Sequence, residues 1–153
     1  MLLILFNAGN ERFGIDVEHV IEVAPLVRFR KAPHTPNYVA GLFNYRGTIV
    51  PVIDLTALIA KKPSKPLLST RIILVKYVFS KDSEHILGLM AEKVMETITC
   101  SEDDFQPPGI DSDTSHYLGD VMYDTDGMIQ KISFEKLFPD SLKKLLFKDK
   151  KEA

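Results

Sequence analysis

Short apolar runs separated by turn residues follow one another along the chain. Four pairs of runs flank turn signals and predict hairpins: residues 2–6 with 12–15, 42–43 with 48–53, 71–79 with 86–90, and 119–123 with 128–133. Residues 94–99 have the composition of a further strand. About eight to ten short strands, divided by frequent Gly and Pro, favour closed β-barrels. The pattern lacks the helices of about 10–15 residues that a parallel α/β sheet needs. The predicted fold class is therefore mainly β.

One short helix is predicted directly after the first hairpin. Asp16 is a suitable N-cap, the apolar residues that follow recur at one-face spacing, and Pro25 ends the segment. Because the apolar face of this helix must point inward, we expect Glu22 to be exposed on its other face.

Further helical segments are predicted at three places. Residues 37–40 form one helical turn capped by Gly41, and residues 55–59 form another. From residue 134 the apolar period becomes helical, which predicts a C-terminal helix over residues 134–148. No tandem repeat and no low-complexity tract interrupts the chain.

Length, charge and cysteine usage narrow the class of protein. The 153 residues suit one domain, and 45% hydrophobic with 26% charged residues is typical of a folded protein. A net charge of -2 gives no overall attraction to nucleic acid or to an anionic membrane. The single cysteine, Cys100, cannot form an internal disulfide, which favours the cytosol. No run approaches the roughly 20 apolar residues of a membrane span.

The candidate chemistry is sparse. The four histidines are scattered without metal-ligand spacing, and no phosphate-binding glycine loop or nucleophile elbow is present, so we expect no metal and no cofactor. One enzymatic alternative remains, a metal-dependent enzyme or small hydrolase that uses the aspartate-rich region. Its members are Asp103, Asp104, Asp111, Asp113, Asp120, Asp124 and Asp126. The sequence around Asp124 to Gly127 covers only a fragment of a calcium loop, and aspartates are common in turns for backbone reasons.

Arg46 lies at the tip of the second predicted hairpin. A guanidinium group is costly to bury, so Arg46 is expected to face solvent or a partner. The run that follows, residues 48–53, is apolar throughout, and we expect Ile49 to lie inside the barrel. On that basis Ile49→Asp should unfold the protein.

An ordered set of motifs extends from Leu3 to about Leu146. It comprises Phe13-Gly14-Ile15-Asp16, Val20-Ile21-Glu22-Val23, Pro36-Asn37-Tyr38-Val39-Ala40-Gly41, the Arg46-Gly47 hairpin with residues 49–55, Leu87-Gly88-Leu89-Met90, Tyr117-Leu118-Gly119 and residues 132–137. In its order and residues this set resembles the CheW family, the bacterial chemosensory coupling proteins. The resemblance implies two intertwined SH3-like five-stranded β-barrels with short helices and a C-terminal helix. It also implies a single domain over residues 1–153, with 15–66 mostly in the first barrel and 67–133 mostly in the second.

The same resemblance implies a non-catalytic adaptor that couples a methyl-accepting chemoreceptor to a CheA-type histidine kinase. The expected partners are the cytoplasmic tip of the receptor and the regulatory domain of the kinase, with no nucleic acid and no direct membrane insertion. Such a protein would lie in the cytoplasm, in membrane-proximal receptor arrays. Arg46 and Glu22 match positions used in coupling, and Val20, Gly41 and Gly47 match positions that shape the surface. A stand-alone SH3-like peptide-binding module is the other alternative.

Some motifs indicate a branch of the family. Residues 43–47, 69–71 and 117–119 are more similar to WspB-type couplers of alternative chemosensory systems than to flagellar couplers. Tyr45 replaces the usual aliphatic residue before the arginine, and Gln130-Lys131 puts polar residues into a strand that is normally apolar. The similarity to WspB-type systems implies that the kinase output controls a cyclic-di-GMP enzyme.

Overall fold

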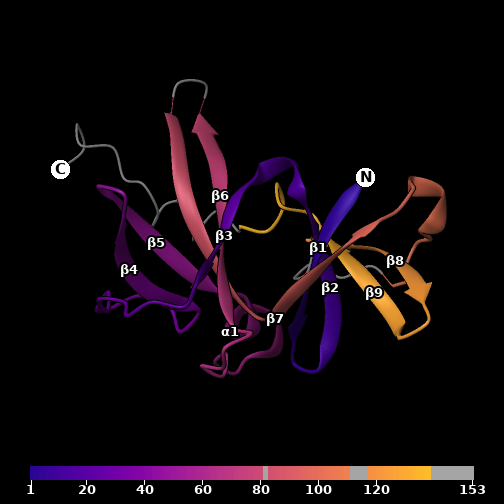
Figure 1. Ribbon diagram of the computed structural model, residues 1–153, viewed down its shortest axis with the longest axis horizontal. Coiled ribbons are helices and arrows are strands. Elements are labelled where there is room, and N and C mark those ends of the chain that lie inside the picture. Colours follow the sequence, from indigo (N-terminus) through magenta and orange to yellow (C-terminus); the bar gives the residue numbers. More distant parts are fainter. Residues whose placement is uncertain (81–82, 111–116, 139–153) are drawn as a thin grey trace.

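The residues that the structure describes form a mainly β fold with one short α-helix (Figure 1). The structure is a computed structural model that describes residues 1–80, 83–110 and 117–138. The strands are β1 (Leu2–Ala8), β2 (Glu11–Asp16), β3 (Val20–Pro25), β4 (Val39–Tyr45), β5 (Thr48–Asp54), β6 (Arg71–Ser80), β7 (Ser83–Thr99), β8 (Leu118–Asp124) and β9 (Gly127–Ile132). The helix is α1 (Leu55–Ala60), and 3₁₀ turns occur at Val17–His19 and Glu102–Asp104.

The four predicted hairpins are confirmed as β1–β2, β4–β5, β6–β7 and β8–β9, all antiparallel. Turn residues with positive φ close three of them: Gly9 and Asn10 in the first, Arg46 and Gly47 in the second, and Gly127 in the last. The run at 94–99 is not a separate strand, because β7 continues from Ser83 to Thr99.

The long strand β7 joins two groups of strands. Its first half pairs with β6 and, in parallel, with β5, and β3 and β4 lie at the outer edges of that group. Its second half pairs with β1, which continues through β2 and β9 to β8. A bulge separates the halves, where Lys93 adopts a φ of 49°. Figure 1 shows β7 running from one group to the other.

Three apolar clusters form the core. The largest lies between the two groups and includes Phe6, Ile15, Ile73 and Leu89. A second cluster lies within the β1–β2–β9–β8 group and includes Cys100, which is buried. The third lies within the group formed by β3, β4, β5, β6 and the first half of β7, which we call the β3–β7 group. It comprises Val50, Ile72 and Leu74, with half-buried aromatic residues packed against it.

The helix predicted after Asp16 is wrong beyond its first turn. Asp16 does act as a cap, since its side chain accepts a hydrogen bond from the Glu18 N–H at 2.9 Å. Only Val17–His19 are helical, and the chain then enters β3, which pairs with β6. The segment is rich in Val and Ile, whose branched side chains favour a pleated strand once a partner strand is available. Glu22 is therefore a strand residue.

Three other expectations differ from the structure. The helical turn predicted at residues 37–40 is absent, because Val39–Tyr45 is a strand that contains Gly41. Ile49 is 62% exposed, whereas its neighbour Val50 is fully buried. Residues 134–138 form turns, and the rest of the predicted C-terminal helix, from residue 139, lies outside the described residues. The turn predicted at residues 55–59 is confirmed as α1.

Candidate functional site

The edges of the β3–β7 group place Glu22 beside the β4–β5 hairpin. Among the named strands of the described chain, β3 pairs with β6 alone and β4 with β5 alone, so no backbone ladder joins β3 to β4. The link between them at this end is made by side chains. Glu22 reaches from β3, and Tyr45 and Arg46 reach from the end of β4 and its turn.

The turn has the backbone geometry that places Arg46 at its tip. Arg46 has a φ of 50° and Gly47 a φ of 88°, so both central residues are left-handed, as in the hairpin turns that match strand twist. The Asn44 side-chain oxygen accepts a hydrogen bond from the Gly47 N–H at 2.7 Å. Asparagine and glycine both tolerate such turns, which explains this local sequence.

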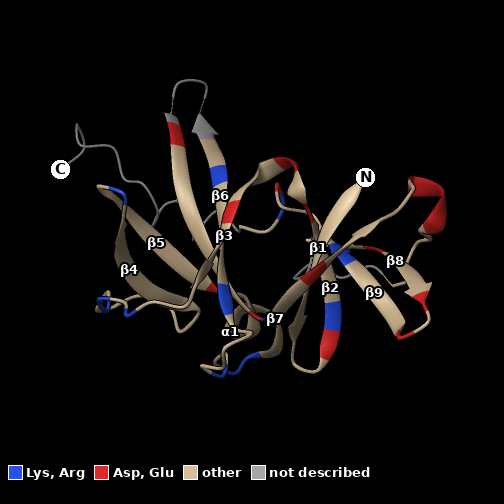
Figure 2. Ribbon diagram, in the orientation of Figure 1, with Lys and Arg blue, Asp and Glu red and all other residues tan. Residues whose placement is uncertain are grey.

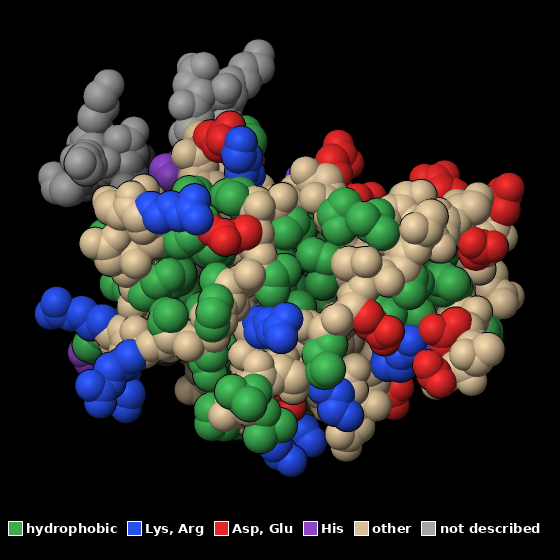
Figure 3. All heavy atoms as spheres, viewed as in Figure 1, with side chains coloured by type: hydrophobic (Ala, Val, Ile, Leu, Met, Phe, Trp, Pro, Cys, Tyr) green, Lys and Arg blue, Asp and Glu red, His purple; other side chains and the backbone are tan. Residues whose placement is uncertain are grey.

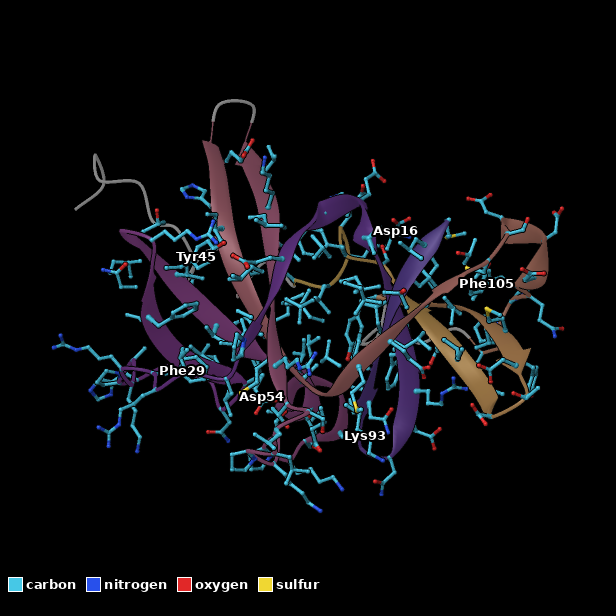
Figure 4. The ribbon with its side chains drawn as sticks, viewed as in Figure 1. Asp16, Phe29, Tyr45, Asp54, Lys93 and Phe105 are labelled. Carbon is cyan, nitrogen blue, oxygen red and sulfur yellow. The ribbon has the colours of Figure 1, made fainter. Side chains whose placement is uncertain are left out.

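Glu22, Tyr45 and Arg46 form one polar cluster, in which a single carboxylate oxygen serves two partners. The Tyr45 hydroxyl donates to Glu22 Oε1, and Arg46 Nη2 lies 3.3 Å from the same oxygen. The guanidinium carbon of Arg46 is 5.2 Å from the centre of the Tyr45 ring, within range of a cation–π contact. The hydrogen bond to Glu22 raises the pKa of Tyr45. Figure 4 labels Tyr45 near the outer end of β4.

The cluster is accessible. The side chain of Arg46 is 77% exposed and that of Glu22 is 37% exposed. Figure 3 shows a basic and an acidic side chain in contact over this part of the molecule, with hydrophobic side chains beside them. Half-buried Phe43 is one apolar neighbour, since its ring centre lies 6.3 Å from that of Tyr45. A charged group beside apolar surface is the usual composition of a protein interface.

Val20, Gly41 and Gly47 have different roles in the structure. Gly41 is buried at a φ of 149°, and a Cβ there would come within 2.5 Å of the Arg30 carbonyl oxygen. Gly41 therefore allows the chain before β4 to pass closely. Gly47 has open space around it, so only its turn geometry favours glycine. Val20 is half-buried and packs against the largest core cluster. The structure thus brings Glu22 and Arg46 together, while the other three act through the backbone and the core.

Tyr45 is a member of the site that the sequence patterns did not indicate. Two signals were available, its position directly before the arginine at the hairpin tip and its replacement of the aliphatic residue that is usual there. Its ring lies 6.3 Å from that of Phe43, which lies 6.1 Å from that of Phe29. Phe43 and Tyr45 lie two residues apart on β4, whereas Phe29 comes from the segment between β3 and β4, so only the contact with Phe29 depends on how separate segments pack.

The aspartates that the structure describes do not gather at one site. Asp124 accepts two hydrogen bonds from Arg12, at 2.7 and 2.8 Å, and this pairing lowers its pKa to about 2. Figure 2 shows acidic residues at several separate places along the ribbon around the β8–β9 end of the molecule. In the described ranges no three His, Cys, Asp or Glu side chains gather as a metal site would require. Asp111 and Asp113 lie outside the described residues.

No helix in residues 1–80, 83–110 or 117–138 has the length and hydropathy of a bilayer-spanning segment.

The chain is similar to known proteins over most of its length. It matches the CheW-like domain over residues 2–142. It is 30% identical over 139 residues to the chemotaxis protein CheW of Rhizobium meliloti, covering 90% of this chain and 86% of that protein. It is 31% identical over 141 residues to a probable chemotaxis protein CheW of Rhizobium etli, covering 91% and 88% of the two.

A solved structure has the same fold. The scaffolding protein TtCheW from Thermoanaerobacter tengcongensis superimposes with a TM-score of 0.77 at 30% identity, covering 90% of this chain and 87% of that one. The domain match, the two relatives and the solved structure agree with one another. The chain belongs to the CheW-like domain family, and it is a non-catalytic scaffolding protein of the kind that serves chemotaxis signalling.

Proposed function

We propose that this protein is an adaptor that couples a methyl-accepting chemoreceptor to a CheA-type histidine kinase. The observation that carries the proposal is the exposed Glu22–Tyr45–Arg46 cluster at the strand edges of a CheW fold. Charged side chains beside apolar surface can set the register of a docked partner while the apolar area supplies affinity. Arg46 and Glu22 would touch the partner, and Val20, Gly41 and Gly47 would shape the surface.

We also propose that each of the two groups of strands joined by β7 forms one SH3-like barrel. Five strands contribute to each group if β7 is counted in both, which supports two intertwined barrels within a single domain. Because β7 runs through both groups, the division into residues 15–66 and 67–133 can only be approximate. β1 and most of β2 precede the first range but belong to the second group.

The partners proposed are the receptor's cytoplasmic tip and the kinase's regulatory domain, in cytoplasmic arrays near the membrane. We also propose the WspB-type branch, in which the output is cyclic-di-GMP. Tyr45 is one of the residues that make this chain more similar to the WspB-type couplers. Its hydroxyl bonds to Glu22, which gives that residue a structural role and supports the branch to that extent. A kinase output confined to the flagellar motor, with cyclic-di-GMP levels unchanged when the protein is deleted, would remove the branch proposal.

The first prediction concerns Arg46→Glu. This change repels Glu22 and reverses the charge that a partner meets, so capture of the kinase and the receptor from lysate should fall by about tenfold. Folding should be nearly unchanged, because exposed substitutions usually alter stability by about 0.5 kcal/mol or less. The measurement is a pull-down with equal amounts of wild-type protein and variant, quantified for both partners.

Lys62→Glu is the matched control, since it makes the same charge change at an exposed residue just after α1. It should capture both partners as the wild type does. Normal capture by Arg46→Glu would contradict the assignment of the site. Capture of unrelated proteins by the wild type, with neither partner present, would instead indicate a stand-alone peptide-binding module.

A further inference from the structure

The turn between β8 and β9 contains the one place in the chain where an aspartate or asparagine directly precedes a glycine, at Asp126-Gly127. Spontaneous rearrangement of an aspartyl peptide is easiest before glycine, because no side chain hinders the approach of the glycine nitrogen to the aspartate carboxyl group. Asp126 is exposed, and Gly127 has a φ of 117° with open space around it. This turn therefore has the composition and the exposure of an isomerisation site.

The reaction at such a site needs no co-reactant. The Gly127 nitrogen bonds to the side-chain carboxyl carbon of Asp126 and gives up its proton to water, while the carboxyl group loses its hydroxyl as water. The product is a five-membered succinimide ring. Water then adds to one of the two ring carbonyl carbons and breaks its bond to nitrogen, which gives either aspartate again or isoaspartate. One water is released and one is consumed.

The structure holds the attacking nitrogen in another contact. The Asp126 N–H donates to the Asp124 carboxylate at 2.8 Å, and the Gly127 N–H donates to the same carboxylate. Rotation of the Asp126–Gly127 peptide toward the Asp126 side chain would take the Gly127 N–H out of this bond, which has a cost. Asp124 is itself fixed, because Arg12 donates to its two oxygens at 2.7 and 2.8 Å.

The ion pair that fixes Asp124 is well placed to persist. The side chains of Arg12 and Asp124 are only 18% and 28% exposed, and a bidentate pair of this kind is stronger than a single contact at an open surface. Arg12 also belongs to β2, which pairs with β9 beside the turn. The restraint on the turn therefore comes from a separate strand.

We infer that Asp126-Gly127 is an isoaspartate-forming site and that the Arg12–Asp124 ion pair keeps it closed. Isoaspartate adds one carbon to the main chain in a turn whose flanking residues, Asp124 and Gly127, are paired across the hairpin. The modified turn no longer fits that register. This inference goes beyond the proposed function, since it concerns how the β8–β9 hairpin ages.

The second prediction is that Arg12→Met speeds isoaspartate formation at Asp126 by about 2–10-fold, because Asp124 loses the donors that fix it. The full chain is incubated at physiological temperature and neutral pH. Isoaspartate is then quantified with an isoaspartate methyltransferase and located by mass spectrometry of its peptides. Arg28→Met is the matched control, since Arg28 is an exposed arginine between β3 and β4, and its rate should equal that of the wild type.

Two further measurements identify the site and the cause. Adding Asp126→Glu to Arg12→Met should abolish the product, because attack by Gly127 would then have to close a less favourable six-membered ring. Amide hydrogen exchange in Arg12→Met should become faster at Gly127 than in the wild type, and should change less at Ile129, which is buried on β9. An equal increase at both amides would mean that the whole hairpin opens, which would overturn the local role of the ion pair.

A free peptide of residues 120–131 gives the rate without the fold. The wild-type protein should form isoaspartate at least about tenfold more slowly than this peptide. Equal rates in the peptide and the protein, or in the wild type and Arg12→Met, would overturn the protective role of the pair. Isoaspartate found only at other residues would overturn the assignment of the site.

Discussion

Neighbouring residues of β5 differ greatly in their exposure to water. Ile49 is 62% exposed beside the hairpin tip, whereas Val50 is fully buried in the third apolar cluster. Strand geometry explains the difference, because successive side chains point to opposite faces. Ile49 lies opposite Asn44 on the outer face of the hairpin, whereas Val50 packs against Ile72 and Leu74 on the face that also carries Phe43 and Tyr45.

The third prediction compares aspartate at these two positions. Val50→Asp places an unpaired charge in the core and should lower the free energy of unfolding by about 3–5 kcal/mol. Ile49→Asp should cost at most about 1 kcal/mol, because its side chain stays in water. Urea unfolding followed by circular dichroism measures both values. Equal losses in the two variants would show that the face assignment of β5 is wrong.

At the scale of elements, Asp54 connects β5, α1 and the loop that follows. Its side chain is buried, yet it accepts hydrogen bonds from the N–H groups of Thr56 and Ala57, at 3.0 and 3.3 Å, which caps the helix. It also accepts from the backbone N–H and the hydroxyl of Ser64, at 2.9 and 2.6 Å. One carboxylate therefore fixes the start of the helix and the path of the loop (Figure 4).

The fourth prediction is that Asp54→Ala lowers the free energy of unfolding by about 2–3 kcal/mol. The change removes the cap and leaves backbone N–H groups of a buried site without an acceptor. Asp16→Ala is the matched control, because Asp16 caps an unburied 3₁₀ turn through one bond to Glu18, and it should cost about 0.5 kcal/mol. The same urea experiment applies. A loss for Asp54→Ala no larger than that for Asp16→Ala would refute the role of the loop contacts.

At the scale of the whole molecule, contacts between distant parts of the chain hold the β8–β9 hairpin in place. Arg12 on β2 binds both carboxylate oxygens of Asp124, 112 positions away. This bidentate pair supports the short parallel pairing of β2 with β9. The Asp126 N–H also donates to Asp124, at 2.8 Å, so the turn and the ion pair share one carboxylate.

The fifth prediction follows from the lowered pKa of Asp124, which falls from 3.8 to about 2 chiefly because of the hydrogen bond from Arg12. A depressed pKa in the folded state means that the ionised form stabilises the fold above pH 3.8, and that this contribution is lost as pH falls through about 2. Arg12→Met should raise the pKa of Asp124 towards 3.8 without reaching it, because bonds from Asp126 and Gly127 remain. NMR titration of the carboxyl carbon measures this, and an unchanged pKa in Arg12→Met would contradict the assigned cause.

Local patterns predicted the hairpins well, and the helices poorly. Turn signals at Asn44–Gly47 and at Asp124–Gly127 act within a few residues, so their effect does not depend on the rest of the fold. The segment after Asp16 was predicted as helix and is mostly strand, because pairing of β3 with β6 outweighs a weak local preference. Ile49 was assigned to the core because a run that is apolar throughout does not reveal which alternate residues face inward.

The candidate site was only partly predictable for the same reason. Arg46 could be found from its hairpin tip, and the motif resemblance pointed to Glu22. Neither source indicated that Tyr45 would bond to Glu22, since the two residues lie on strands that share no backbone pairing in the described chain.

By itself the sequence determined the mainly β class, the positions of the hairpins and the family, because these depend on local turn chemistry and on the order of motifs. Only the tertiary structure decided that β7 is one continuous strand through both groups, which face of β5 is buried, and that Glu22, Tyr45 and Arg46 meet. The physical reason is that strand pairing and side-chain contact between distant segments depend on how the whole chain packs, which no local pattern specifies.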